Sequence, residues 1–231
     1  MCIRDRFVKS QHNVEIQYAV EATVQPVACL TKYEIRNLLE YFNMPQELIC
    51  RKAFPGPALA ARIVGPVSQE NLAFEKKVHD IVESKVDDYY KEQFGKAMII
   101  NAQGEQEPFQ VFAATIEDVS SAKVTGVFKG RRSYTSPLCI KENWDYSKLT
   151  KQAEALTEHA RLFFELGGGK NDGKFDVVIR CVNSLDARTA TVTDLPFELL
   201  QTLQEQLTKL VETRTVYFDV TPKPPGTIEY V

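Results

Sequence analysis

The stretch that decides the fold is Lys223-Pro224-Pro225-Gly226-Thr227-Ile228-Glu229-Tyr230, near the end of the 231-residue chain. Two consecutive prolines fix φ and remove two backbone donors, so the segment is expected to stay extended, with one hinge at the glycine. Lys223 and Glu229 could then face a ligand without losing much entropy on binding. The alternative interpretation is a Pro/Gly turn that closes a sheet.

A second rigid turn, Phe54-Pro55-Gly56-Pro57, leads into the apolar run 59–64. Within this Pro-Gly-Pro unit, only the glycine carries a backbone N–H. Such an unshielded donor suits an oxyanion or the edge of a base that comes close to the backbone. The alternative is a strand entry whose turn is merely rigid.

Hydrophobic periodicity predicts the elements between and around these turns. Apolar residues at helical spacing predict helices over residues 31–42, 68–89, 147–163 and 194–210. Runs rich in β-formers predict strands over 59–64, 109–117, 123–129, 133–140, 175–182 and 215–220. This order predicts an α+β fold, a mostly antiparallel sheet covered by helices on one side, with a meander over 109–140.

Composition narrows the possible functions. With 44% hydrophobic residues the chain can bury one good core or two small ones. A net charge of −3 without a basic stripe argues against a nucleic acid partner, so any basic pocket is local, which suits a nucleotide monophosphate. No apolar stretch approaches the roughly 20 residues of a membrane span. The five cysteines lack metal or disulfide spacing, which indicates the cytoplasm and no metal site.

Together with Lys123–Tyr134, the two proline turns resemble the C-terminal dimerisation domain of GMP synthase, the glutamine-hydrolysing ligase that aminates xanthosine monophosphate (XMP). The most specific motifs are Phe-Pro-Gly-Pro and Lys-Pro-Pro-Gly-Thr-Ile-Glu. Residues Lys9–Asn13 and Leu30–Pro45 resemble the tail of that family's ATP pyrophosphatase domain.

The resemblance implies a division into two domains. Residues 1–50 would be the tail of the ATP pyrophosphatase domain, with 1–6 expected to be non-native, and residues 51–231 would be the C-terminal dimerisation domain. Residues 141–174 match nothing in the family and are interpreted as an insertion packed on the domain's edge. The alternative for this insertion is a lid or a partner-docking element.

The resemblance also implies a function for the complete enzyme. ATP, with Mg, adenylates the base oxygen of XMP, and ammonia from glutamine then displaces AMP to give GMP. This chain would supply the nucleotide pocket and a homodimer contact, next to upstream ATP pyrophosphatase and glutaminase domains or a subunit. It contains neither the Ser-Gly-Gly-x-Asp-Ser phosphate loop nor a Gly-x-Cys-x-Gly elbow. We therefore expect it to bind no cofactor itself and to be inactive alone.

Site residues follow from the same resemblance. The implied XMP-binding residues are Pro55, Gly56, Pro57, Arg132, Lys223, Ile228 and Glu229. A guanidinium and an ammonium suit a phosphate, and a carboxylate accepts hydrogen bonds from the N–H groups of a purine dione. Lys9 and His12 are the candidate catalytic residues, for which simple exposure near a chain end is the alternative.

Departures from the family pattern leave two further functions open. Ala58 replaces a glycine of the family, and the acidic residue expected at Gly130 is missing. Such drift fits a divergent ATP pyrophosphatase-type paralogue with a different acceptor, or a pure dimerisation module. The GMP synthase interpretation requires that the two proline turns, represented by Gly56 and Lys223, fold toward a common pocket within one chain or with a neighbouring copy.

Overall fold

The structure is a computed structural model that describes residues 26–27, 29–49, 58–95, 99–100, 106–107, 109–128, 130–169, 173–184 and 189–230. The chain divides into two compact units, Met1–Arg51 and Lys52–Val231, which we describe separately. None of the helices in these described ranges combines the length and the apolar character that a membrane span requires.

The smaller unit contains the helices α2 (Lys32–Tyr41) and α3 (Gln46–Ile49). Thr31 and Glu34 cap α2 reciprocally. The Thr31 hydroxyl accepts a hydrogen bond from the Glu34 N–H at 3.3 Å, and the Glu34 carboxylate accepts one from the Thr31 N–H at 2.6 Å. This capping box satisfies N–H groups that the first helical turn leaves without partners. The helix predicted over 31–42 is confirmed.

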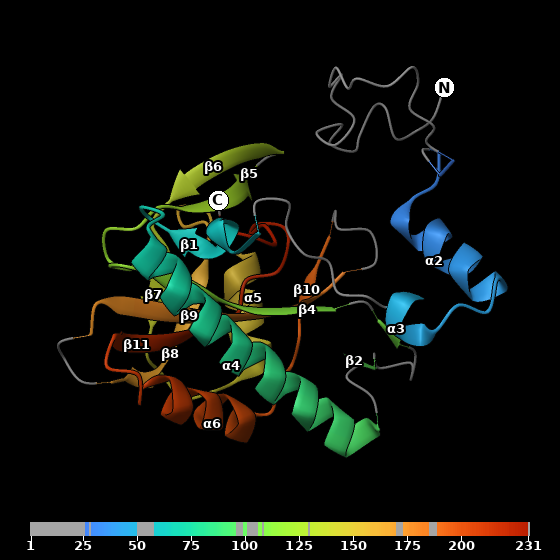
Figure 1. Cartoon of the computed structure of the whole chain (residues 1–231). Coiled ribbons are helices and arrows are strands. Elements are labelled where there is room, and N and C mark those ends of the chain that lie inside the picture. Colours follow the sequence, from blue (N-terminus) through green and yellow to red (C-terminus); the bar gives the residue numbers. More distant parts are fainter. Residues whose placement is uncertain are drawn as a thin grey trace, which may run out of the picture. The chain divides into compact units, whose positions relative to one another are not determined.

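The larger unit is built on one sheet with the strand order β1-β4-β9-β11-β8-β7, and β10 pairs with β9 (Figure 1). Its strands are β1 (Ile63–Val64), β4 (Phe109–Ile116), β7 (Leu138–Ile140), β8 (Leu162–Gly168), β9 (Phe175–Asn183), β10 (Thr191–Val192) and β11 (Thr213–Asp219). Two more pairs form separate small sheets: β2 (Ile99–Ile100) with β3 (Gln106–Glu107), and β5 (Val124–Phe128) with β6 (Arg131–Thr135).

The α+β class is confirmed, but the main sheet is mixed, which corrects the expectation of a mostly antiparallel one. The parallel pairs β1–β4, β9–β11 and β8–β7 alternate with the antiparallel pairs β4–β9 and β11–β8. The meander predicted over 109–140 is wrong, because β5 and β6 pair with each other outside the sheet. As a result, β9, β11 and β8 separate β4 from β7.

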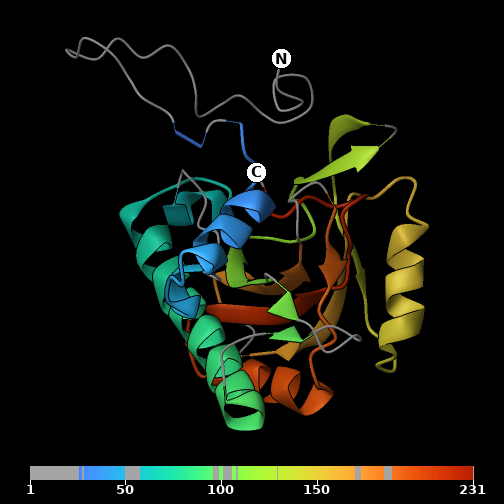
Figure 2. The same cartoon turned by 90° about the vertical axis from the view of Figure 1, so that its right-hand side faces the viewer.

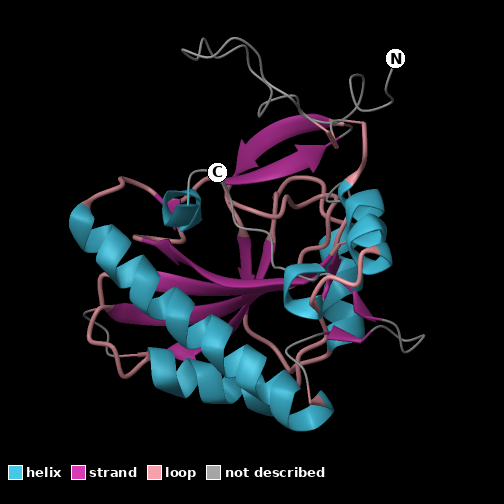
Figure 3. Ribbon diagram, turned by 45° about the vertical axis from the view of Figure 1, so that its right-hand side comes forward, coloured by secondary structure: helices cyan, strands magenta, loops and turns pink. Residues whose placement is uncertain are grey.

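Helices cover one face of the main sheet, as predicted. The long helix α4 (Gln69–Phe94) runs across the strands and packs on β4 and on α6 (Phe197–Leu207) (Figure 3). The shorter helix α5 (Tyr146–Glu154) contributes to the same hydrophobic core and lies beside the sheet (Figure 2). The strand predicted over 59–64 is wrong for most of its length, because this stretch begins as the 3₁₀ helix η1 (Ala58–Arg62). Only Ile63 and Val64 form a strand, which is β1.

The start and the inner face of α4 follow the sequence pattern. The Ser68 hydroxyl accepts a hydrogen bond from the Asn71 N–H at 3.1 Å and so caps the first turn. Val78, Val82 and Val86 lie about one turn apart and are fully buried. The predicted helix therefore has its apolar stripe against the sheet.

Side chains of the central strands alternate between two faces. On β9, Val177 and Ile179 belong to the core under the helices, whereas Val178 faces the opposite side, as does Arg180 by the period of two. That second face carries its own core, which includes Tyr230 near the end of the chain. Both faces of the sheet are therefore covered, one by helices and one by irregular chain.

The placement of residues 141–174 corrects the sequence interpretation. These residues include α5 and also β8, which lies inside the sheet between β11 and β7 rather than at its edge. Phe163 and Phe164 are buried on opposite faces. The helix predicted over 147–163 ends at Glu154, because pairing with the distant strand β11 decides the conformation of an apolar run that fits either period. That the segment is an insertion relative to the family stays a prediction.

Candidate functional site

Residues Thr221–Tyr230, hereafter the terminal segment, lie on the sheet face opposite the helices. The Lys223 N–H donates to the Ala190 carbonyl at 2.8 Å, and the Val127 N–H donates to the Pro225 carbonyl at 2.6 Å. The segment is therefore bound along one side by β5 and at its start by the residue before β10.

The terminal segment turns where the sequence predicted an extended chain. The Gly226 N–H donates to the Pro222 carbonyl at 2.9 Å, and the peptide bonds before Pro224 and Pro225 are both cis. Lys223 and Gly226, on the two sides of this turn, each form a β-bridge to the rest of the domain. The proline pair thus forms a corner that is attached at both ends.

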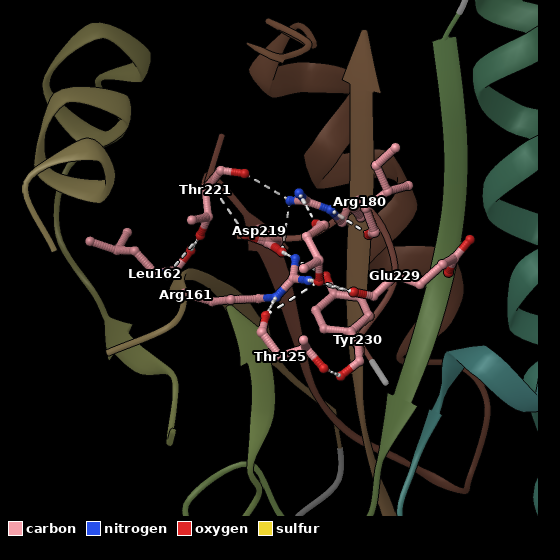
Figure 4. A network of polar contacts seen from close by, with 10 residues as sticks. Thr125, Arg161, Leu162, Arg180, Asp219, Thr221, Glu229 and Tyr230 are labelled. Atoms are coloured by element: carbon pink, nitrogen blue, oxygen red, sulfur yellow. Dashed lines mark hydrogen bonds and ion pairs between the residues drawn. The ribbon is translucent and has the colours of Figure 1, made fainter. Parts of the chain in front are cut away.

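Two fully buried arginines, Arg161 and Arg180, hereafter the arginine pair, hold the backbone of the terminal segment (Figure 4). Arg180 donates to the carbonyls of Thr221 at 2.9 Å, Thr227 at 2.7 Å and Ile228 at 3.0 Å. Arg161 donates to the Glu229 carbonyl at 2.6 Å and to the Thr227 hydroxyl at 2.7 Å. Backbone carbonyls that would otherwise be buried without donors are therefore satisfied by side chains of β9 and of the residue that precedes β8.

The carboxylate of Asp219 lies between the two guanidinium groups. It contacts Arg161 at 2.7 Å and Arg180 at 2.8 Å, and all three side chains are fully buried. The carboxylate also accepts hydrogen bonds from the Tyr230 hydroxyl at 2.8 Å and from the Thr221 N–H at 2.9 Å. This single anion therefore supports both arginines and contacts both ends of the terminal segment.

Electrostatics fix the protonation states of this network. Burial alone would raise the pKa of Asp219, but Arg180 and Arg161 outweigh it and hold that pKa below its usual value. Burial, followed by the charge of Asp219, raises the pKa of Tyr230 well above its usual value. Asp219 therefore stays an acceptor and Tyr230 a donor over the physiological pH range.

Gly126 allows β5 to approach the terminal segment closely. A Cβ at this position would lie 2.7 Å from the Ala160 Cβ and 3.1 Å from the Pro225 carbonyl oxygen. We expect Gly126→Ala to lower the free energy of unfolding by about 1–3 kcal/mol, because the added methyl group overpacks this contact. Urea denaturation measures the change.

Gly168→Ala is the matched control for that substitution. A Cβ at Gly168 would lie 3.4 Å from its nearest neighbour, the Arg214 carbonyl oxygen, which is an ordinary contact. Stability within about 0.5 kcal/mol of the wild type, or slightly above it, is expected for the control. Equal effects of the two substitutions would contradict the close approach at Gly126.

A second cluster of polar side chains, hereafter the Arg62 cluster, consists of Arg62 on η1 with His79 and Glu229. The Arg62 Nε lies 3.6 Å from the Glu229 Oε2, and its Nη1 lies 3.1 Å from the ring nitrogens of His79. Its guanidinium also stacks on the Phe112 ring at 4.4 Å. In Figure 4 the Glu229 carboxylate points away from Asp219 and the arginine pair. The arginine pair therefore holds the backbone of Glu229, whereas the Glu229 side chain contacts Arg62.

The structure brings several predicted site residues together. Lys223, Ile228 and Glu229 all lie on the terminal segment, with Lys223 partly exposed and Ile228 packed against the second core. Arg132 is exposed on β6 and stands opposite Val127, the residue that bonds to Pro225. Arg132 therefore lies one strand away from the terminal segment and makes no contact with it among the interactions described.

The remaining predicted residues lie outside the described ranges. These are the candidate catalytic residues Lys9 and His12 and the turn residues Pro55, Gly56 and Pro57. Within the described part of the larger unit, the chain that follows this turn reaches the terminal segment through Arg62. The predicted meeting of Gly56 with Lys223 stays a prediction.

Sequence reasoning missed Arg161, Arg180 and Asp219 as parts of this site. A signal was available, because Arg180 lies within the apolar run 177–182 of β9, and Asp219 directly follows the apolar run 216–218 of β11. A charged residue inside such a strand requires a buried partner of opposite sign. To predict that Arg180 and Asp219 are partners, one must also know the strand order, which places β9 beside β11.

Comparison with known proteins finds a family that is similar to the part of the chain containing Arg180, Asp219 and the terminal segment. Residues 166–230 match the family model described as "GMP synthase C terminal domain". This part of the chain is therefore similar to the C-terminal domain of GMP synthases. The matched range includes the last three residues of β8, all of β9, β10, α6 and β11, and the terminal segment, whereas Arg62, Arg132 and Arg161 precede it.

Curated relatives are similar over almost the whole chain. A glutamine-hydrolyzing GMP synthase subunit of Methanopyrus kandleri is 31% identical over 98% of this chain and 56% of its own length. The corresponding GMP synthase subunits of Saccharolobus islandicus and Sulfurisphaera tokodaii are 30% and 28% identical, each over 96% of this chain and 62% of its own length. The chain thus spans about three fifths of these relatives, and the resemblance to the GMP synthase family is confirmed beyond the matched domain.

Proposed function

We propose that this chain is the C-terminal part of a GMP synthase, the ligase that aminates XMP to GMP with ATP and ammonia from glutamine. In this proposal the chain supplies the pocket for XMP and a contact between two copies of the protein. ATP activation would belong to an ATP pyrophosphatase domain, and ammonia release to a glutaminase domain or partner subunit. The relatives are themselves named as subunits of GMP synthase, which supports such a division of labour.

The observation that carries this proposal is the built-in rigidity of the terminal segment. Lys223 and Glu229, the cation and carboxylate of the family motif, sit on a segment that the arginine pair holds by four hydrogen bonds to backbone carbonyls and one to the Thr227 hydroxyl. A ligand that meets both residues therefore loses little conformational entropy of the protein on binding. A nucleotide monophosphate with a purine dione base offers what each needs, phosphate oxygens for the ammonium and N–H donors for the carboxylate.

Binding to a set of nucleotides tests the proposal with the chain as it stands. Isothermal titration should give tighter binding for XMP than for AMP, IMP or GMP. Lys223→Ala and Glu229→Gln should each weaken XMP binding by at least about tenfold, the effect of losing one charge-assisted hydrogen bond. Lys209→Ala and Glu154→Gln, at exposed positions in or after the helices, are the matched controls and should leave the affinity unchanged.

The other outcomes point to the other interpretations of the chain. Tighter binding of a different nucleotide would favour a pyrophosphatase-type paralogue with another acceptor. A dimer by light scattering that binds none of the nucleotides would favour a dimerisation module. Formation of GMP from XMP, ATP and ammonia by this chain alone would contradict the assignment of activation to another part of the protein.

A further inference from the structure

Two carboxyl groups, one fully buried and one partly exposed, lie around the guanidinium of Arg62, and the proposed function uses only one of them. Glu229 on the terminal segment is the one that contacts Arg62, at 3.6 Å. Glu75 on α4 is the other; its side chain is fully buried, and within the part of the chain that the structure describes neither of its carboxyl oxygens has a hydrogen-bond partner. A fully buried carboxyl without a donor needs an explanation.

The surroundings of the two carboxyls differ. Glu229 retains 19% of its side-chain exposure and also feels the positive charges of Arg180 and Arg161. Glu75 is enclosed, and the groups that act on it are the Thr115 hydroxyl on β4, Arg62 and Glu229. His79, which lies against Arg62, has Glu83 at 3.4 Å on its other side.

A count of charges decides which carboxyl is ionised. One guanidinium in a medium of low dielectric can balance one nearby carboxylate, and a second would stay buried without compensation. Glu229 has Arg62 at 3.6 Å, the additional charges of Arg180 and Arg161 and some contact with solvent, whereas Glu75 is fully enclosed. The negative charge therefore belongs to Glu229, and the proton belongs to Glu75.

We propose that Arg62 is a positioning residue that keeps Glu229 ionised and directed at the base of the nucleotide, and that it can do so because Glu75 is held as the uncharged acid. This inference rests on the proposed function, in which Glu229 reads the N–H groups of a purine dione. A Glu75 carboxylate would compete for the same guanidinium and leave Glu229 protonated. A protonated Glu229 would present an O–H donor to a base edge that also donates.

The titration behaviour agrees with this assignment. Burial raises the pKa of Glu75 well above its usual value, against opposing effects of Thr115 and Arg62. Burial also raises the pKa of Glu229, and Arg62 is the main group that opposes the rise. Without Arg62, Glu229 would therefore ionise only at a higher pH.

A carboxyl titration by NMR tests the charge assignment without any ligand. The full chain would carry ¹³C-labelled glutamate, and the resonances would be assigned by their loss in Glu75→Gln and Glu229→Gln. At pH 7 the Glu75 carboxyl carbon should have the chemical shift of a neutral acid and the Glu229 carbon that of a carboxylate. An ionised Glu75 at pH 7 would overturn the inference, as would a neutral Glu229.

The pH dependence of XMP binding tests the positioning role. Arg62→Met should weaken binding by at least about tenfold and move the midpoint of the pH profile upward by about one unit, the effect of one lost ionic partner. Arg62→Lys keeps the positive charge, so the midpoint pH of its binding profile should lie close to that of the wild type. In Glu75→Gln, which mimics the neutral acid, the midpoint should stay in place, and a downward shift would show that Glu75 had competed for Arg62.

The two experiments distinguish a failure of the proposed function from a failure of the positioning role of Arg62. A wild-type chain that does not bind XMP contradicts the proposed function, and the NMR titration then still decides the charge assignment. XMP binding whose pH profile is the same in the wild type and in Arg62→Met contradicts the positioning role alone. A thermal melt of each variant shows whether a weaker affinity comes from unfolding.

Discussion

Asp219→Asn is expected to lower the free energy of unfolding by about 3–5 kcal/mol, the usual cost of removing one partner from a buried ion pair. The asparagine keeps the shape of the side chain but leaves two fully buried guanidinium groups without an anion. Its NH₂ group would also face N–H donors of the arginine pair. Urea denaturation followed by the fluorescence of Trp144, the single tryptophan of the chain, measures the change.

Asp88→Asn is the matched control, because Asp88 lies on the surface of α4 and contacts Lys91 at 3.8 Å with both side chains more than half exposed. Such an exposed pair contributes about 0–1 kcal/mol. A loss below about 1 kcal/mol in Asp219→Asn would show that the buried network does not depend on its anion.

Acidification provides an independent check on the same carboxylate. The pKa of Asp219 is lower in the folded chain than its usual value, so its contribution to stability is fully present above the unfolded pKa of about 3.9 and is lost as the pH falls through the folded pKa. The difference in stability between the wild type and Asp219→Asn should therefore narrow below about pH 4. A difference that widens on acidification would contradict the sign of this shift.

Arg180→Lys is expected to lower the free energy of unfolding by about 2–4 kcal/mol and to loosen the terminal segment. A lysine keeps the charge beside Asp219, but its single ammonium cannot reach the carbonyls of Thr221, Thr227 and Ile228 together. Each buried carbonyl left without a donor costs about 1–3 kcal/mol.

Hydrogen exchange measures this loosening at individual amides. The Val127 and Lys223 N–H groups, which bond to or from the terminal segment, should exchange at least about tenfold faster in Arg180→Lys. Arg131→Lys, at an exposed position on β6, is the control and should leave both rates unchanged. Unchanged exchange at Val127 in Arg180→Lys would mean that β5, and not the arginine pair, holds the segment.

Local signals in the sequence predicted the helices of this chain well. Thr31 and Ser68 cap the helices that they were expected to begin, because a hydroxyl three residues before a free N–H acts within a single turn. The end of α5 was not predicted, since Leu162 and Phe163 continue the helical spacing of apolar residues. In the sheet, Phe163 instead pairs with Asp219 of β11, more than fifty residues away, and Leu162 pairs with Leu138 of β7.

The candidate site divides in the same way. The motif around Lys223 and Glu229 was recognised because its prolines and charged residues are contiguous. Arg161 and Arg180 were not, because a buried arginine has meaning only with its partner, and the partner Asp219 follows much later in the chain. The same holds for Glu75, whose burial without a donor is visible only in three dimensions.

The sequence by itself determined the α+β class, the start and cap of the long helix α4, the resemblance to the GMP synthase C-terminal domain and the importance of the proline motif. Each of these depends on residues close together in the chain, whose physical preferences act locally. Only the tertiary structure decided the mixed order of the sheet, the turn of the terminal segment, and the buried charges that hold it. Those features depend on which distant strands pair, because pairing alone brings Arg180 and Asp219 to one face and removes both from water.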